Sequence, residues 1–195
     1  MFTFDMSNKV KVNMNTILFI IGSTRLKSFN RQVAKYVEGL LKGKTNVKYL
    51  DFTELPFINQ DKEEPVQEVV SRIREEIMNA DGLWVFSPEY NYSYPGYIKN
   101  LFDWLSRPND PTIQNGPTAI AGKKITITGA GGTFATKGMR KKLTELLGFI
   151  KADVMKEPMT GIHVTPEAWG SNILTLSQED KEHLQKQADA FLQFI

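Results

Sequence analysis

The sequence contains no cysteine at all, and this absence removes several classes of protein. Disulfide scaffolds, thiolate metal sites, iron–sulfur clusters and a cysteine nucleophile are excluded. The lack of cysteine also fits a reducing compartment. Histidine occurs only at His163 and His183, too few and too far apart to indicate a metal site. We therefore expect no bound metal.

A strong excess of charge of one sign is missing too. The 24 Lys and Arg residues against 22 Asp and Glu give a net charge of +2, which does not suggest a nucleic-acid groove or a membrane patch. The apolar run over residues 17–21 is far shorter than the roughly 20 residues that cross a bilayer. Residues 1–15 lack the pattern of a secretory signal. We expect them to form a flexible N-terminal arm on a cytoplasmic protein.

The remaining composition is that of one globular domain. The chain has 195 residues, of which 41% are hydrophobic and 11% aromatic, enough for a substantial core. No repeat, low-complexity tract or change of composition marks a boundary, so we expect a single domain over residues 16–195.

Strand-like and helix-like segments alternate along this domain. Apolar or alternating patterns predict strands over residues 16–21, 46–51, 81–87, 123–128 and near 152–156. Apolar stripes at helical spacing predict helices from Ser28 to about Lys42, from Pro65, from Pro95, around Met139 to Leu147, and over residues 178–194. This alternation predicts an α/β fold with a five-stranded parallel sheet covered by helices on both faces. Right-handed crossovers leave few topologies, of which we favour the flavodoxin-like strand order 2-1-3-4-5.

Ligands of such sheets bind beyond the carboxyl ends of the strands, which draws attention to three loops. The first, residues 22–30, offers hydroxyl groups, an arginine and the free amides of a helix start, a combination suited to a terminal phosphate. Simple capping of the helix by Ser28 is the alternative.

The other two loops are aromatic and glycine-rich. Residues 87–96 hold three tyrosines and Asn91 between two prolines, which suits the edge of a flat ligand, although tyrosines also fill subunit interfaces. Residues 129–135 place three glycines after the fourth strand, where the backbone can approach a ligand closely. Phe134 stands where a dinucleotide fingerprint needs its third glycine, so we expect no independent dinucleotide site there.

Two motifs make the chain resemble the NADPH-dependent FMN reductase family, flavodoxin-like enzymes that include quinone, chromate and azo-dye reductases. GSTRLKSFN, Gly22 to Asn30, is similar to the family's G-S-x-R-x-x-S-x-N phosphate loop. SPEYNYSYPGYIKNLFDWLSR, Ser87 to Arg107, is similar to its S-P-E-Y-N-x-S-x-P-G-x-L-K-N-x-I-D-W segment. The resemblance extends from about Ile17 to Leu147.

The resemblance implies FMN as cofactor and NADPH or NADH as hydride donor. It places the FMN phosphate on the first loop, the isoalloxazine on the second and its pyrimidine end near the third. The implied cofactor-binding residues are Ser23, Thr24, Arg25, Ser28, Phe29, Asn30, Pro88, Glu89, Tyr90, Asn91, Tyr92, Ala130, Gly131 and Gly132.

The same resemblance implies a reaction and an assembly. A hydride passes from the nicotinamide to flavin N5, and the flavin then reduces a quinone-like, azo or other acceptor, which requires no side-chain acid or base. Asp103 and Trp104 are similar to the family's dimer-forming segment, so we expect a homodimer or homotetramer. A non-catalytic flavin electron carrier and a redox-sensing flavoprotein are the alternatives.

Three further patterns have simpler interpretations. Residues 39–45 look like a P-loop but have one residue too few between the glycines and end a helix instead of following a strand. We expect Glu63 and Glu64 to be solvated. Lys137, Arg140, Lys141 and Lys142 form a basic cluster that is either an exposed helix face or an attraction for the phosphates of a dinucleotide.

Overall fold

The computed structural model describes residues 14–195, so the expected N-terminal arm lies, up to residue 13, outside the described residues. The strands are β1 (Thr16–Ile21), β2 (Asn46–Tyr49), β3 (Gly82–Phe86), β4 (Lys124–Gly131), β5 (Asp153–Val154) and β6 (Gly161–His163). The helices are α1 (Phe29–Leu41), α2 (Glu68–Asn79), α3 (Gly96–Leu105), α4 (Lys137–Phe149), α5 (Pro166–Ser171) and α6 (Gln178–Phe194), with a 3-10 turn, η1 (Gln60–Lys62). In this part of the chain no helix is long and apolar enough to span a membrane.

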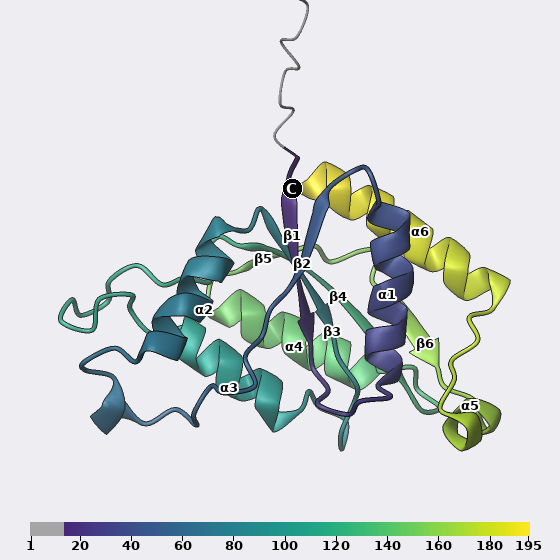
Figure 1. Ribbon diagram of the computed structural model, residues 1–195, viewed down its shortest axis with the longest axis horizontal. Helices are drawn as coiled ribbons and strands as arrows, with labels where there is room; N and C mark the ends of the chain where they lie inside the picture. The colour runs from purple at the N-terminus through teal and green to yellow at the C-terminus, as the bar shows by residue number, and fades with distance from the viewer. Residues whose placement is uncertain (1–13) are drawn as a thin grey trace, which may run out of the picture.

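The strands form one parallel sheet in the order β2-β1-β3-β4-β5, which confirms the predicted flavodoxin-like topology. Helices α1 and α6 cover one face, and α2, α3 and α4 cover the other (Figure 1). The alternation of side chains along β1 shows how both faces are filled. Leu18 and Ile20 belong to the α2–α4 core, whereas Ile17 and Phe19 belong to the α1–α6 core.

Two elements between residues 155 and 178 were not predicted. β6 pairs with the last three residues of β4, Gly129 to Gly131, while β5 pairs only with the first two. Three residues are too few for a periodic pattern, so nothing in the sequence distinguished β6 from a loop. Helix α5 did have a signal, because Thr165 caps it and Pro166 occupies its first turn.

The prediction that Pro65 opens a helix is wrong. Helix α2 begins at Glu68, because the carbonyl of Gln67 accepts the first helical hydrogen bonds, from Val70 N and Ser71 N, both at 3.0 Å. The prediction for Glu63 is also wrong. Its carboxylate is an ion pair with Arg107, 2.8 Å from Nε, and its side chain is only 12% exposed. The last helix has the predicted bounds, fixed by a reciprocal capping box between Ser177 and Asp180.

A buried glutamine joins α6 to the sheet. Gln187 is fully buried, and its Oε1 accepts hydrogen bonds from Thr128 Oγ1 at 3.0 Å and from Thr160 N at 2.8 Å. Its Nε2 donates to Thr126 Oγ1 at 2.8 Å and to Ile127 O at 3.0 Å. Trp84 Nε1 completes the network by donating to Thr128 Oγ1 at 2.9 Å. Both polar atoms of this buried amide have two hydrogen-bond partners each. The network therefore fixes the distance between α6 and β4.

We expect Gln187→Met, which keeps length and volume, to lower the free energy of unfolding by roughly 2–4 kcal/mol, because it leaves several buried polar groups without partners. Urea denaturation measures this loss. Gln185→Met is the control, since Gln185 is only half-buried and its side chain donates a hydrogen bond to Asp189 near the surface of α6. It should change stability by less than about 0.5 kcal/mol. An equal loss of unfolding free energy in the two variants would show that the buried network does not stabilise the fold.

Candidate functional site

The carboxyl ends of β1, β3 and β4 meet at one edge of the sheet. Gly22 N donates to Phe86 O at 2.8 Å, and Ser87 N donates to Thr128 O at 3.0 Å, so the three chains leave the sheet side by side. A Cβ at Gly22 would lie only 2.8 Å from Ser87 Oγ and 2.9 Å from an atom of Ile98. Glycine is therefore required where the first loop leaves the sheet, because only hydrogen fits there.

The first loop folds back onto the amino end of α1. Ser28 N donates to Arg25 O at 3.1 Å, and Ser28 Oγ caps the helix by accepting from Arg31 N at 3.3 Å. Ser28 therefore caps α1, as the simpler alternative predicted, and the loop also turns back toward the amino end of the helix. The free amides and the positive end of the helix dipole face the loop, an arrangement that favours an anion.

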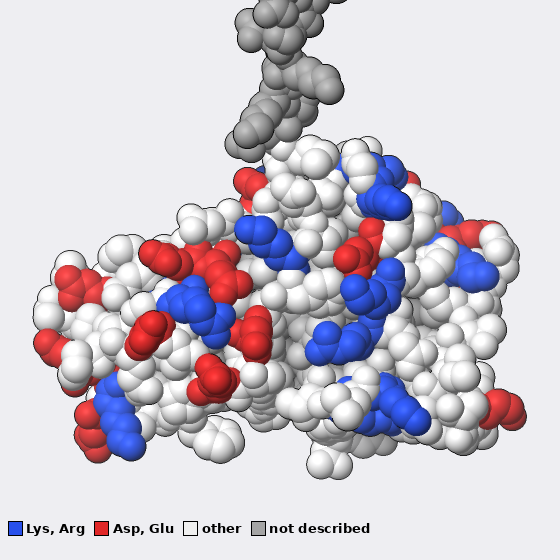
Figure 2. Space-filling model, in the orientation of Figure 1, with Lys and Arg blue, Asp and Glu red and all other residues white. Residues whose placement is uncertain are grey.

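Positive charge surrounds this helix end. Lys and Arg side chains follow α1 across the face shown in Figure 2, and the exposed basic residues of loop and helix are Arg25, Lys27, Arg31 and Lys35. Within residues 14–195, no carboxylate forms a salt bridge with Arg25. Its side chain instead donates to Asn172 Oδ1 and lies over the rings of Phe29 and Trp169. The guanidinium therefore keeps a full charge for an anionic ligand.

Phe29 and Asn30, both predicted to bind the cofactor, are buried beneath this loop. Asn30 is 3% exposed, and its side-chain amide donates to Ala130 O at 3.0 Å while its Oδ1 accepts from Ala130 N at 2.9 Å. This amide pairs with the free backbone of β4 and joins the first loop to the third segment. Both residues shape the wall of the site and present little surface to a ligand.

The second loop contains a tight hairpin with unusual backbone angles. Tyr90 and Ser93 exchange two backbone hydrogen bonds of 2.9 and 3.0 Å, and the residues between them, Asn91 and Tyr92, have φ of 51° and 59°. Such a two-residue turn needs left-handed backbone at both positions, which Asn tolerates but a bulky Tyr does not favour. The turn leaves Tyr90 56% and Tyr92 63% exposed at the edge of the site. Backbone strain that displays aromatic rings is typical of a binding loop.

Glu89 joins the second loop to the third segment. Its Oε2 accepts a hydrogen bond from Met139 N at 2.7 Å, at the amino end of α4. The residue before α4, Thr136, has left-handed backbone and no side-chain capping bond, so Glu89 provides the cap. A Cβ at Gly138 would lie 3.1 Å from this carboxylate, which explains the small residue there.

The glycine segment is only partly the loop that we expected. Gly129 to Gly131 belong to β4, and a Cβ at Gly129 would collide with Thr136 Oγ1. At Gly131 it would lie 2.8 Å from Thr136 Cγ2. These two glycines make room for the buried Thr136. Only Gly132 has open space beside its Cα, where a ligand can approach the backbone.

A cavity of about 300 Å³ lies between the second and third segments. Across its mouth the rings of Tyr92 and Phe134 are 5.9 Å apart, and Phe134 is 61% exposed. Its lining combines carboxylate, amide, hydroxyl and aromatic groups from Glu89, Asn91, Tyr92, Gly132, Thr133, Phe134 and Thr136. Three of these lining residues were not predicted as site residues: Thr133, Phe134 and Thr136. The sequence alone did not show that the loop between β4 and α4 folds against the tyrosine hairpin.

Arg140 differs from the exposed basic cluster that we expected. It turns inward and donates to Met159 O at 2.6 Å and to Ala135 O at 3.5 Å. Burial lowers the pKa of its guanidinium, which the charges of Glu157 and Glu89 partly offset. Lys137, Lys141 and Lys142 remain exposed on the same helix. Arg140 thus holds the loop before α4 in place instead of adding to an exposed patch.

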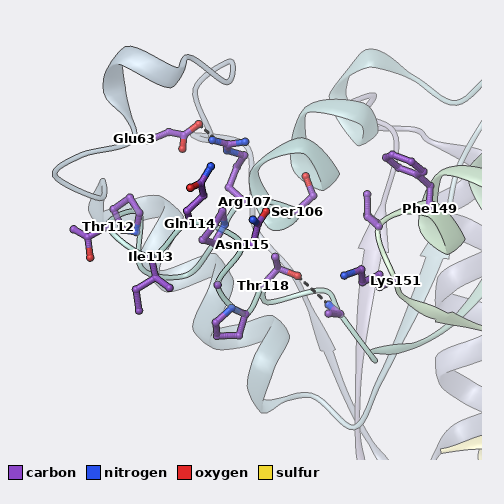
Figure 3. Close-up of a pocket in the computed structure, with 16 residues that line it drawn as sticks. Glu63, Ser106, Arg107, Thr112, Ile113, Gln114, Asn115, Thr118, Phe149 and Lys151 are labelled. Carbon is purple, nitrogen blue, oxygen red and sulfur yellow. Dashed lines mark hydrogen bonds and ion pairs between the residues drawn. The ribbon is translucent and has the colours of Figure 1, made fainter.

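A larger cavity, of about 760 Å³, lies elsewhere, between the loop after α3 and the end of α4 (Figure 3). Helices α3 and α4 both run from the carboxyl edge of the sheet, so their last residues lie at its amino edge. In Figure 3 Arg107 points toward Glu63, with which it forms the ion pair described above. Ligands of open α/β sheets bind at the other edge, so we assign the functional site to the three converging segments. Residues 14–195 contain no cluster of metal-ligating side chains.

Comparison with known proteins places the chain among enzymes of one kind. The family model described as NADPH-dependent FMN reductase matches residues 15–166. A Burkholderia protein named 2-hydroxy-1,4-benzoquinone reductase is 29% identical over 92% of this chain and 95% of its own. The quinone reductase of Escherichia coli K12 is 33% identical over 97% of both chains. Among solved structures, a flavoenzyme NAD(P)H:(acceptor) oxidoreductase from Paracoccus denitrificans matches with a TM-score of 0.80 and 28% identity, covering 92% of this chain and 96% of that one.

The left-handed backbone at Tyr92 generates a prediction about stability. Glycine at this position removes about 1–2 kcal/mol of backbone strain, which offsets much of the lost ring contact and the entropy cost of glycine. We expect Tyr92→Gly to be less destabilising than Tyr90→Gly by about 1 kcal/mol or more, since the two tyrosines are similarly exposed but Tyr90 is not among the positive-φ residues. Urea denaturation of both variants makes the comparison. A larger loss at Tyr92 would show that the turn is not strained.

Proposed function

Because the chain belongs to the NADPH-dependent FMN reductase family, we propose that the three segments at the carboxyl edge of its sheet bind FMN and carry out the family's reaction there. The protein is an FMN-dependent NAD(P)H oxidoreductase of the quinone and azo reductase type. The observation that carries the assignment to this edge is Arg25, a cation without a carboxylate partner in the described chain, beside the amino end of α1.

The residues at this edge suit the phosphate of FMN. In our proposal Arg25 and the hydroxyls of Ser23 and Thr24 contact the phosphate, together with the amides of the loop and of the first turn of α1. Ser28 caps α1, so its role is to shape the loop. Charge-assisted hydrogen bonds from Arg25 and from backbone amides suit a dianion at this position. The exposed basic side chains along α1 add a favourable long-range field.

The second and third segments suit the ring system. Pro88, Glu89, Tyr90 and Asn91 form one side, and Tyr92 extends it toward Phe134. Ala130, Gly131 and Gly132 lie at the opposite side, where Gly132 leaves its backbone open to a ligand. Because Glu89 caps α4, its contact also holds the two sides at a constant separation.

When bound, FMN supplies the redox chemistry, accepting a hydride from NAD(P)H and returning the two electrons to a quinone or azo acceptor. The protein's part is to bind and orient the reactants and to limit the access of water. The exposed rings of Tyr92 and Phe134 beside the cavity provide apolar surface against which a flat acceptor or a nicotinamide can pack. We assign no side chain to proton transfer.

A spectroscopic experiment tests this function. The as-purified protein, loaded with FMN under anaerobic conditions, should lose its flavin absorbance rapidly on addition of NADPH or NADH. The absorbance should return when a benzoquinone is added. Bleaching that is slow with both nicotinamides would favour an electron carrier or a redox sensor and contradict the reductase.

Arg25 generates the second test. We expect Arg25→Ala to raise the Kd for FMN roughly 10- to 150-fold, which corresponds to one charge-assisted hydrogen bond of about 1.5–3 kcal/mol. Quenching of FMN fluorescence measures the Kd, and riboflavin, which lacks the phosphate, is the matched ligand control. Lys27→Ala, which removes an exposed charge from the same loop, should have a much smaller effect. Unchanged FMN affinity in Arg25→Ala would refute the phosphate role.

The assembly and the location complete the proposal. Trp104, expected at a dimer contact, is 2% exposed and donates to Pro56 O at 2.8 Å, so it binds its own chain. The same loop presents Phe57, which is 85% exposed and available to a second copy. We propose a homodimer or homotetramer, which sedimentation equilibrium would test, and a cytoplasmic location, supported by the absence of cysteine.

A further inference from the structure

The segment around α5 holds the arginine of the first loop. Arg25 donates a hydrogen bond to Asn172 Oδ1, at the end of α5, across 147 residues of sequence. Its guanidinium carbon lies 4.9 Å from the ring centroid of Phe29 and 5.8 Å from that of Trp169. The two rings are perpendicular, at 89°, with centroids 4.9 Å apart. The cation is thus held on one side by an amide oxygen and on the other by an aromatic corner.

The holding segment is itself fastened to α1. Gln32 Nε2 donates to Asn172 O at 3.0 Å, and Gln32 Oε1 accepts from Leu174 N at 2.8 Å. One glutamine therefore binds the backbone on both sides of residue 173. Helix α5 lies beside the amino end of α1 in Figure 1, which is the end that carries Arg25. These hydrogen bonds fix the segment against the site, so it is more than a loop that passes nearby.

The chemistry of the partners is as informative as their position. Asn172 and the two rings are neutral, so they fix the direction of the guanidinium without cancelling its charge. A carboxylate at residue 172 would also fix it but would compete with an anionic ligand. Immobilising a long side chain on binding costs conformational entropy, and a side chain that is already held in place avoids part of that cost.

From this geometry we propose that residues 165–174 are a phosphate-specificity strap, in which Asn172 and Trp169 are positioning residues that orient Arg25 toward the FMN phosphate. Both residues lie beyond residue 166, where the match to the family model ends. The inference rests on the proposed function and deepens it. It assigns discrimination of FMN from riboflavin to a segment of the chain outside the family's matched region.

Glycine at residue 172 is the cleanest test. Asn172 has φ of 61°, a backbone conformation that glycine adopts without strain, and the bonds of its backbone to Gln32 and Ala168 do not need the side chain. Asn172→Gly should therefore fold with an unchanged melting temperature. We expect its Kd for FMN to rise roughly fivefold, the factor that corresponds to about 1 kcal/mol of lost orientation, with the Kd for riboflavin unchanged. Trp169→Ala should likewise raise the Kd for FMN and leave the Kd for riboflavin unchanged.

Asn172→Asp separates positioning from mere structural support. Aspartate tolerates the left-handed backbone and keeps the contact with Arg25, but it adds a carboxylate beside the phosphate site. We expect the Kd of Asn172→Asp for FMN to be roughly tenfold or more above that of the unchanged protein, and so also above that of Asn172→Gly. Thermal stability should not fall. Ser171→Ala is the control. It removes the hydrogen bonds of Ser171 Oγ to Glu167 O and from Ile173 N but no contact with Arg25, so it should leave both affinities unchanged.

A double-mutant cycle distinguishes the two proposals. If Asn172 acts through Arg25, then Asn172→Gly in an Arg25→Ala background causes no further loss of FMN affinity. If Arg25→Ala weakens FMN binding but the single variant Asn172→Gly does not, the strap is overturned and the proposed phosphate site stays intact. Arg25→Ala without effect overturns the phosphate site and the strap together. Equal losses of FMN and riboflavin affinity in Asn172→Gly would also overturn the strap.

Discussion

The close contact between β1 and β3 where the two strands end is the constraint on which the site depends. Gly22 and Ser87 approach so closely that no side chain fits at residue 22. The backbone bonds from Gly22 to Phe86 and from Ser87 to Thr128 then bring three chain segments out of the sheet at neighbouring points. Because both faces of the sheet are buried, strand register cannot shift without exposing core side chains, and the position of the three segments is correspondingly rigid.

Polar side chains then join these segments into one structure. Asn30 connects the first loop to β4, and Glu89 connects the tyrosine hairpin to α4. Gln32 connects α1 to the end of α5, and Asn172 connects the end of α5 to Arg25 of the first loop. In each case a side chain from one segment satisfies backbone or charged groups of another, so several polar residues shape the site instead of presenting their polar atoms to a ligand. Thr24, Arg25, the two tyrosines of the hairpin and the backbone at Gly132 are among the groups that stay accessible at this edge.

The site residues differ in how well the sequence predicted their roles. The hydroxyls and the arginine of residues 22–30 lie at a helix amino end, as the pattern indicated, because a buried strand followed by Ser28 specifies that turn. The sequence did not show why Gly129 and Gly131 are small, since that need arises from Thr136, which packs against them at the end of β4. The burial of Trp104 was likewise not visible in the sequence, because its hydrogen-bond partner, Pro56 O, lies 48 residues earlier in the chain.

The sheet order and the helices on both faces could be predicted from the amino-acid sequence, because periodic burial and turn residues are local properties of the chain. The same pattern indicated the edge at which we propose that FMN binds. The sequence could not show which polar side chains stay accessible at that edge and which form hydrogen bonds inside the protein. That choice depends on partners far apart in sequence, such as Asn30 with Ala130 and Arg25 with Asn172, and no local pattern records them. The assignment of α5 to the site is of this second kind, since it follows from contacts between distant segments alone.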